Sequence, residues 1–107
     1  MQDIPDDVFR ALADPTRRGL FERLSREGEL TVRGLTAGSG VSQPAVSKHL
    51  AVLKRSRLVS DRRDGRETHY RAQPEGLSAV VDWLGYYAAF WDDRIDRLED
   101  LLSRMDQ

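Results

Sequence analysis

An unbroken heptad of apolar residues near the end of the 107-residue chain constrains the fold more than any other feature. Its positions alternate at intervals of four and three, the pattern of a helix that packs along a second helix. They are Leu77, Val81, Leu84, Ala88, Trp91, Ile95, Leu98, Leu102 and Met105. A helix over 77–105 is roughly 43 Å long, whereas the residues before it would form a body only about 28 Å across. The sequence therefore predicts a homodimer with the stripe from Leu77 to Leu102 at its interface, together with the first helix.

Capping signals divide the first 40 residues into three shorter helices. The first opens at an acidic pair near residue 6, where negative charge suits the helix dipole. A second has Asp14 as its N-cap and Pro15 at its first position, and should end near Gly28. Thr31 is the expected N-cap of a short third helix that runs to about Gly38 and is weakened by its glycines.

The clearest signal of the chain opens a fourth helix, expected over Ser42–Ser56. Its first residue is a good N-cap, and Val46, Leu50 and Leu53 recur at i, i+4 and i+7 as one buried stripe. A rotation of about 100° per residue turns the other side outward. That outward side consists of Pro44, Ser47, Lys48, Ala51 and Arg55, with Gln43 at its flank.

Two helices joined by a glycine turn at Ser39-Gly40 have the spacing of a helix-turn-helix, whose second helix can lie in the major groove of DNA. Gln43 can pair with adenine, and Lys48 with guanine or a phosphate. The predicted DNA contacts of this recognition helix are Ser42, Gln43, Pro44, Ser47, Lys48 and Arg55.

Residues 58–63 and 67–72 are short extended segments around Asp64-Gly65, which is a hairpin turn signal. Arginines gather at the tip, so behind a helix-turn-helix this hairpin is expected to be a wing that contacts the DNA backbone. The predicted wing contacts are Arg62, Arg63, Arg66 and His69. The predicted fold is mainly α with a small β-hairpin, a winged helix-turn-helix in the order α-α-α-α-β-β-α that dimerises through the long C-terminal helix.

Charge is segregated along the chain in a way that its net charge of −1 conceals. Residues 41–71 carry a net +5, whereas residues 1–40 carry −1 and residues 72–107 carry −5. A basic middle between acidic ends is typical of a module that binds a polyanion. We expect one domain over 1–107, with a DNA-binding core and wing at 6–72 and a dimerisation helix at 74–105.

Three segments together resemble the ArsR family of repressors. They are Val8–Arg18, Val41–Leu53 and Asp64–Arg71, and the resemblance extends over about residues 6–105. It implies a homodimeric winged-helix repressor that binds an inverted-repeat operator, often in its own promoter. Family members read DNA with positions that match Gln43, Pro44, Ser47 and Lys48 here. One departure is Ser39, where similar sequences usually have leucine, and we therefore expect a looser third helix.

Many proteins of this family are metal sensors, but their ligands are missing from this sequence. Thiolate sites need cysteine, and the chain has none. The alternative site on the final helix combines histidine with carboxylates, and this helix has acids such as Asp92 and Asp96 but no histidine. Carboxylates alone suit magnesium or calcium rather than transition metals. We expect no metal site and no cofactor.

No motif for catalysis is present, because the chain lacks a phosphate-binding glycine loop, a zinc-protease motif and a nucleophile elbow. His49 falls beside the buried stripe of the fourth helix, where a packing or structural role is favoured over base contact. We expect a regulator rather than an enzyme. The absence of a signal sequence and of a spanning segment predicts a cytoplasmic protein, associated with the nucleoid when bound to DNA.

Two alternatives to a simple repressor stay open. One is a winged-helix adaptor that binds proteins, although such a surface would favour exposed apolar residues over the small polar ones predicted here. The other is a repressor gated by a small organic ligand, because the aromatic cluster from Trp83 to Trp91 suits either an effector pocket or ordinary interface anchors.

Overall fold

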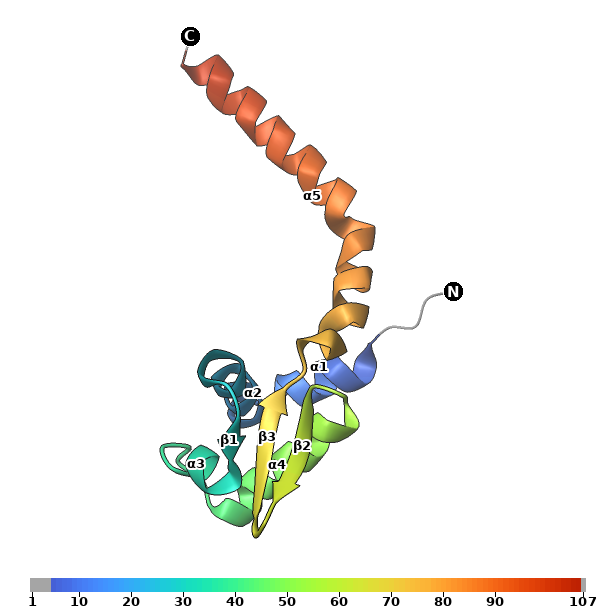
Figure 1. The fold of residues 1–107 in the computed structure, drawn as a ribbon. Coiled ribbons are helices and arrows are strands. Elements are labelled where there is room, and N and C mark those ends of the chain that lie inside the picture. The colour runs from blue at the N-terminus through green and yellow to red at the C-terminus, as the bar shows by residue number, and fades with distance from the viewer. Residues whose placement is uncertain (1–4, 107) are drawn as a thin grey trace.

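The protein has a small helical body from which one long helix projects, away from the tip of a β-hairpin (Figure 1). The structure is a computed structural model and describes residues 5–106. Its elements are α1 (Asp6–Ala13), α2 (Pro15–Glu27), β1 (Leu30–Thr31), α3 (Val32–Thr36), α4 (Gln43–Arg55), β2 (Val59–Asp64), β3 (Glu67–Ala72), the 3-10 helix η1 (Pro74–Leu77) and α5 (Ser78–Met105). The predicted fold, a mainly helical winged helix-turn-helix, is confirmed, with β1 and η1 as additions.

The three predicted N-caps begin their helices as expected. Asp14 accepts a hydrogen bond from the Arg17 amide at 3.0 Å, Thr31 from Gly34 at 3.0 Å, and Ser42 from Ala45 at 3.3 Å. Because that amide bond favours the charged carboxylate, the pKa of Asp14 lies below its ordinary value. Local cap chemistry therefore fixes where α2, α3 and α4 start.

α3 is shorter than predicted, because it ends at Thr36 rather than near Gly38. Ser39, the residue that departs from the family pattern, closes this end: its hydroxyl donates to the Thr36 carbonyl at 2.8 Å. Arg23 of α2 adds bonds to the carbonyls of Gly34 at 3.0 Å and Ala37 at 2.8 Å. These polar contacts hold the helix-turn-helix against α2.

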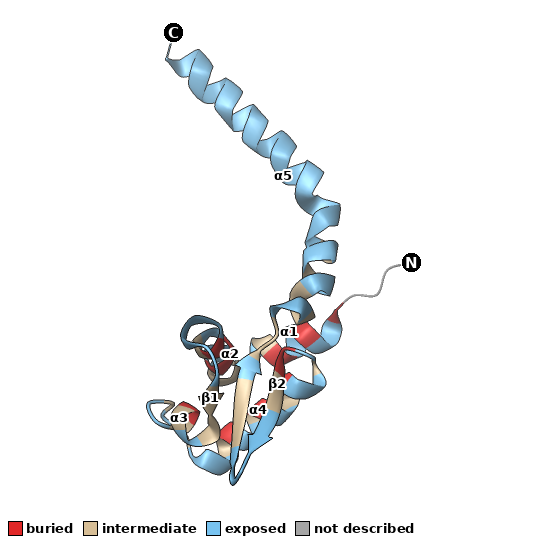
Figure 2. Ribbon diagram, in the orientation of Figure 1, coloured by how far each residue is buried: buried red, intermediate tan, exposed pale blue. Residues whose placement is uncertain are grey.

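The core lies where α1, α2, α3, α4 and the start of β2 meet (Figure 2). The predicted stripe of α4 is confirmed, since Val46, Leu50 and Leu53 are fully buried. They pack with Leu24, Leu35, Leu58 and other apolar side chains, and no polar side chain of the described residues is buried. The polar side of α4 is consequently left outside.

The hairpin is part of a three-stranded antiparallel sheet in the order β1-β3-β2. β2 spans residues 59–64 rather than the predicted 58–63, and β3 lies at the predicted 67–72. The two-residue strand β1 pairs Leu30 with Tyr70 and Thr31 with His69. This pairing joins the middle of β3 to the segment that leads into α3.

α5 begins at Ser78, four residues later than predicted, because residues Pro74–Leu77 form a 3-10 turn. Leu77 packs partly against the core of its own chain instead of extending the free stripe. The rest of the stripe is exposed along the helix (Figure 2): Val81 by 63%, Trp91 by 61% and Ile95 by 51%. Across residues 5–106, no helix is both long and apolar enough to traverse a bilayer.

Candidate nucleic-acid interface

The N-terminal half of α4 presents a continuous polar edge. Ser42, Gln43, Pro44, Ser47 and Lys48 are all exposed, as predicted for the outward side of this helix. The small partly buried Ala45 and exposed Ala51 flank this edge and leave its backbone open to close approach. A major groove admits an α-helix with such an edge, whose exposed side chains offer hydrogen-bonding groups to base edges.

Arg55 is exposed but lies apart from this edge. It is the last residue of α4, about 18 Å along the helix axis from Gln43. It lines a hollow together with the acidic residues Asp6 and Asp7 of α1. The structure thus separates Arg55 from the other predicted recognition residues.

His49 holds α4 to the preceding helices instead of facing outward. Its ring is partly buried, and its Nδ1 lies 3.4 Å from a guanidinium nitrogen of Arg17. The same guanidinium donates to the carbonyls of Ala11 at 2.6 Å and Arg10 at 3.1 Å, at the end of α1. Arg17 therefore links the C-terminus of α1 to the middle of α4.

The tip of the hairpin carries free arginines. Gly65 turns the chain with a φ of +63°, which glycine adopts without a steric penalty. Arg63 is exposed, and its guanidinium contacts only the Gly65 carbonyl at 3.3 Å within residues 5–106. Arg66 is exposed and has no hydrogen bond or ion pair in the described part of the chain. Both charges are available to an external anion.

Arg62 and His69 differ from these two, because both contact Glu29. The Arg62 guanidinium donates to Glu29 Oε1 and Oε2 at 3.0 and 3.2 Å, and a second nitrogen reaches Oε1 at 2.6 Å. His69 Nδ1 lies 3.5 Å from the same carboxylate. The hydrogen bond from Arg62 lowers the pKa of Glu29 and raises that of Arg62. Two of the four predicted wing residues, which pair with each other two positions from the end of the hairpin, thus hold the middle of the wing to the segment before β1.

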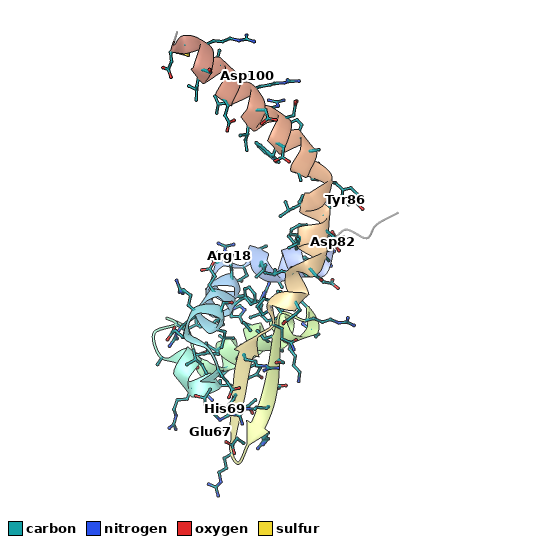
Figure 3. All side chains as sticks on the ribbon, turned by 45° about the horizontal axis from the view of Figure 1, so that its top comes forward. Arg18, Glu67, His69, Asp82, Tyr86 and Asp100 are labelled. Atoms are coloured by element: carbon teal, nitrogen blue, oxygen red, sulfur yellow. The ribbon has the colours of Figure 1, made fainter. Side chains whose placement is uncertain are left out.

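Glu29 was missed from the sequence, and no local signal could have found it. Its place beside Arg62 depends on β1 pairing with β3, which brings Thr31 opposite His69. Figure 3 shows His69 and Glu67 together near the hairpin tip, far from Tyr86 and Asp100 on α5.

A polar hollow joins the recognition helix to the wing. Its volume is about 380 Å³, and it is lined by Thr31, Val32, Arg33, Gln43, Arg66, Glu67 and Thr68. Gln43 from α4 and Arg66 from the wing tip thus border one surface, although 22 positions separate them in the sequence. Arg33, which no local sequence signal singles out, adds an exposed positive charge there.

The donor atoms of residues 5–106 form no transition-metal site within one chain. Cysteine is absent from the sequence. Within residues 5–106, no three histidine or acidic side chains gather closely enough to hold a metal ion. Glu29 and Glu67 lie against opposite nitrogens of the His69 ring, at 3.5 and 3.8 Å, so they do not converge on one point.

α4 buries an apolar stripe and leaves a polar edge free. A capped helix and a turn precede it, and a hairpin with arginines at its tip follows it. This arrangement defines a winged helix-turn-helix DNA-binding protein. Residues 14–61 match the family model described as "Bacterial regulatory protein, arsR family". The chain belongs to the ArsR family of transcriptional regulators, which are not enzymes.

Individual relatives agree with this assignment. The chain is 50% identical over 76 residues to "HTH-type transcriptional regulator Rv2034" of Mycobacterium tuberculosis, covering 71% of this chain and 70% of that protein. It is 32% identical over 79 residues to "Transcriptional repressor SdpR" of Bacillus subtilis, covering 74% and 87%. A solved structure from Mycobacterium bovis, described as a homodimeric winged helix-turn-helix DNA-binding domain, superposes with a TM-score of 0.63 at 28% identity, covering 78% of this chain and 79% of that one.

Proposed function

We propose that this protein is a homodimeric transcriptional repressor that binds an inverted-repeat operator through α4 and the wing. The observation that carries the proposal is the free polar edge of α4, bordered by a wing arginine across one hollow. Binding of a dimer across a promoter would exclude other proteins from that DNA, which is the simplest means of repression. The repressor name of the Bacillus subtilis relative supports this sign of regulation.

Dimerisation is supported by α5, no residue of which is buried in the single chain. Large apolar side chains such as Leu84, Ile95 and Leu102 are more than half exposed along one side. A contiguous apolar stripe of this length marks an interface. A second copy fits it, because a two-fold axis brings the same stripe from each chain together. The homodimeric Mycobacterium bovis neighbour supports the same arrangement.

The proposed contacts fall into two classes. Gln43, Ser47 and Lys48 read base edges, because they lie on the exposed N-terminal turns of α4. Arg63 and Arg66 contact phosphates, because they are exposed, positive and free at the wing tip. Arg62 and His69 are reassigned from DNA contact to support of the wing, since Glu29 already neutralises that position.

We infer that transition metals do not gate this repressor, because the chain has neither thiolates nor a histidine on α5. An organic effector remains compatible with the aromatic residues of α5. Phe9, Trp83 and Tyr87 form consecutive edge-to-face contacts, each with ring centroids 5.3 Å apart. The same contacts also suit the joint between α1 and α5 that a dimer interface requires.

Selection of binding sites from a random duplex library with the purified protein tests this function. We expect a two-fold symmetric site whose half-sites lie about one helical turn, or about 34 Å, apart. The affinity should fall steeply with salt, as counterions are released from phosphates, and should be the same with EDTA as with added zinc. If the selection enriched no sequence and binding did not depend on salt, the result would instead favour the adaptor alternative.

Replacing Arg66 by alanine is expected to weaken operator and random duplexes alike, because a phosphate contact carries no sequence information. The slope of log affinity against log salt should become shallower by about 1.8, or 0.9 for each protomer. Fluorescence anisotropy between about 50 and 200 mM salt measures both quantities. Arg62→Ala is the matched control: because Arg62 is paired with Glu29, its slope should change less. An equal change in both variants would restore Arg62 to the contact set.

A further inference from the structure

The recognition helix and the dimerisation helix are joined through one close backbone contact. α4 ends in a Schellman turn, in which Leu58 N donates to Leu53 O at 2.9 Å and Arg57 N donates to Lys54 O at 3.0 Å. Arg57 occupies the left-handed position of this turn with a φ of +62°, the only positive φ at a non-glycine residue among the described residues. The usual residue there is glycine, so the chain holds a disfavoured conformation at this point.

Gly76 of η1 lies directly on this turn. A Cβ atom at Gly76 would overlap the Arg57 carbonyl oxygen and would lie 2.8 Å from the Arg57 carbonyl carbon and 3.2 Å from a methyl carbon of Leu58. The other seven glycines are not so confined: only Gly34 has any neighbour within 4 Å of such a Cβ, the nearest at 3.3 Å. The contact is completed by Gln73 N, which donates to Leu58 O at 2.7 Å, and by Gly76 N, which donates to Gln73 O at 2.9 Å.

We propose that the contact between Gly76 and the Arg57 carbonyl is a positioning contact that sets the half-site spacing of the operator. α5 begins two residues after Gly76, and α4 ends two residues before Arg57, so this contact helps to fix the angle between the two helices. In a dimer formed through α5, that angle determines how far apart the two copies of α4 lie. The inference rests on the proposed function, because it requires an inverted repeat read by a dimer.

The geometry of α4 amplifies a small change at this contact. A side chain at Gly76 would push the two backbones apart by about 1 Å. Because this displacement acts about 5 Å from the axis of α4, it can tilt that axis by about 11°. Over the length of about 18 Å between Arg55 and Gln43, such a tilt moves the recognition edge by about 3–4 Å. The rise of one base pair is about 3.4 Å. A methyl group at this junction therefore shifts the recognition helix by about one base pair.

Gly76→Ala tests the proposal on synthetic duplexes that carry the selected operator with its half-sites moved together or apart by one or two base pairs. We expect wild type to prefer one spacing. Gly76→Ala should bind that spacing about tenfold more weakly, comparable to the effect of one mismatched base pair. It should prefer a different spacing or discriminate less between spacings. Its affinity for a single half-site should equal that of wild type. An unchanged spacing profile in a folded, dimeric Gly76→Ala protein overturns the proposal.

Two Arg57 variants keep the proposal falsifiable if Gly76→Ala fails to fold by circular dichroism. Arg57→Gly suits the left-handed position but loosens it, so we expect a broader spacing profile. Arg57→Asn removes the charge and retains the left-handed preference, so the profile should stay as in wild type. A change as large in Arg57→Asn as in Arg57→Gly would assign the effect to the side chain and would overturn the proposal.

Gly19→Ala is the matched glycine control, because Gly19 lies within α2 and a Cβ there meets nothing within 4 Å. It should keep the wild-type spacing profile. Selection with wild type separates the two levels of inference. If no symmetric site emerges, the proposed operator is wrong, whereas a symmetric site with variants that all keep its spacing contradicts only the role of Gly76.

Discussion

Replacing Ile95 by glutamate is expected to convert the protein to monomers and to remove operator binding. Ile95 lies in the middle of the exposed apolar stripe of α5 and is 51% exposed in the single chain. A dimer would bury one new charge from each protomer without a partner, at a cost of about 3–5 kcal/mol each. The dimer dissociation constant should rise by at least about 10⁴-fold. Sedimentation equilibrium measures this constant directly.

The loss of DNA binding follows from the loss of the dimer. Two linked recognition helices bind a symmetric site more tightly than separate ones, by about 10²–10⁴-fold, because the second contact is intramolecular. Ala89→Glu is the matched control, since Ala89 lies on the acidic side of the same helix and is exposed. It should remain dimeric, as should Ile95→Leu. An Ile95→Glu protein that stayed dimeric would place the interface elsewhere and would remove the basis for a two-fold operator.

Local sequence signals predicted most of this fold because each depends on a few neighbouring residues. An N-cap needs one side chain and an amide three positions on, so Asp14, Thr31 and Ser42 were identified correctly. The stripe of α4 depends on helical periodicity alone. The free stripe of α5 followed from length, because a helix longer than its domain must leave part of its surface uncovered.

The features that were missed depend on contacts between distant parts of the chain. β1 has two residues and exists only because β3 pairs with it, and the role of Glu29 follows from that pairing. The start of α5 was placed at Pro74, since proline suits the first turn of either helix type. The close approach of Gly76 to Arg57 accompanies the 3-10 turn found there. No local sequence pattern encodes the pairing of Glu29 with Arg62 or the contact of Gly76 with Arg57.

The structure distinguishes basic residues that have an acidic partner from those that have none, which a count of charges cannot do. Both kinds contribute to the net charge of +5 over residues 41–71. Arg62 is neutralised by Glu29, and Lys54 pairs with Asp61 at 3.0 Å. Lys48, Arg63 and Arg66 have no acidic partner within the described residues. Arg55, Arg57 and Arg71 have no ion pair there either, but they line the separate hollow beside α1. In the proposed complex, the free cations that face DNA are therefore fewer than the sequence suggests and lie at the α4 edge and the wing tip.

Gln43→Ala and Lys48→Ala are expected to remove sequence recognition, and they should do so in different ways. A bidentate contact to a base contributes about 1–3 kcal/mol of discrimination, so loss from both protomers weakens operator binding by roughly 30-fold to 10⁴-fold. Gln43 is uncharged, so its replacement should leave binding to a scrambled duplex and the salt slope unchanged. Lys48→Ala should weaken both duplexes and lower the slope, because a cation near phosphates also displaces counterions.

Competition between operator and scrambled duplexes at one salt concentration measures the difference between these variants. If Gln43→Ala kept the full operator affinity, the N-terminal turns of α4 would not read bases, and specificity would have to come from the wing or from DNA shape. In that case Arg66→Ala, rather than Gln43→Ala, would lower the ratio of operator to scrambled affinity. Gln43→Ala and Arg66→Ala therefore decide whether α4 or the wing, on opposite sides of the hollow, reads the DNA sequence.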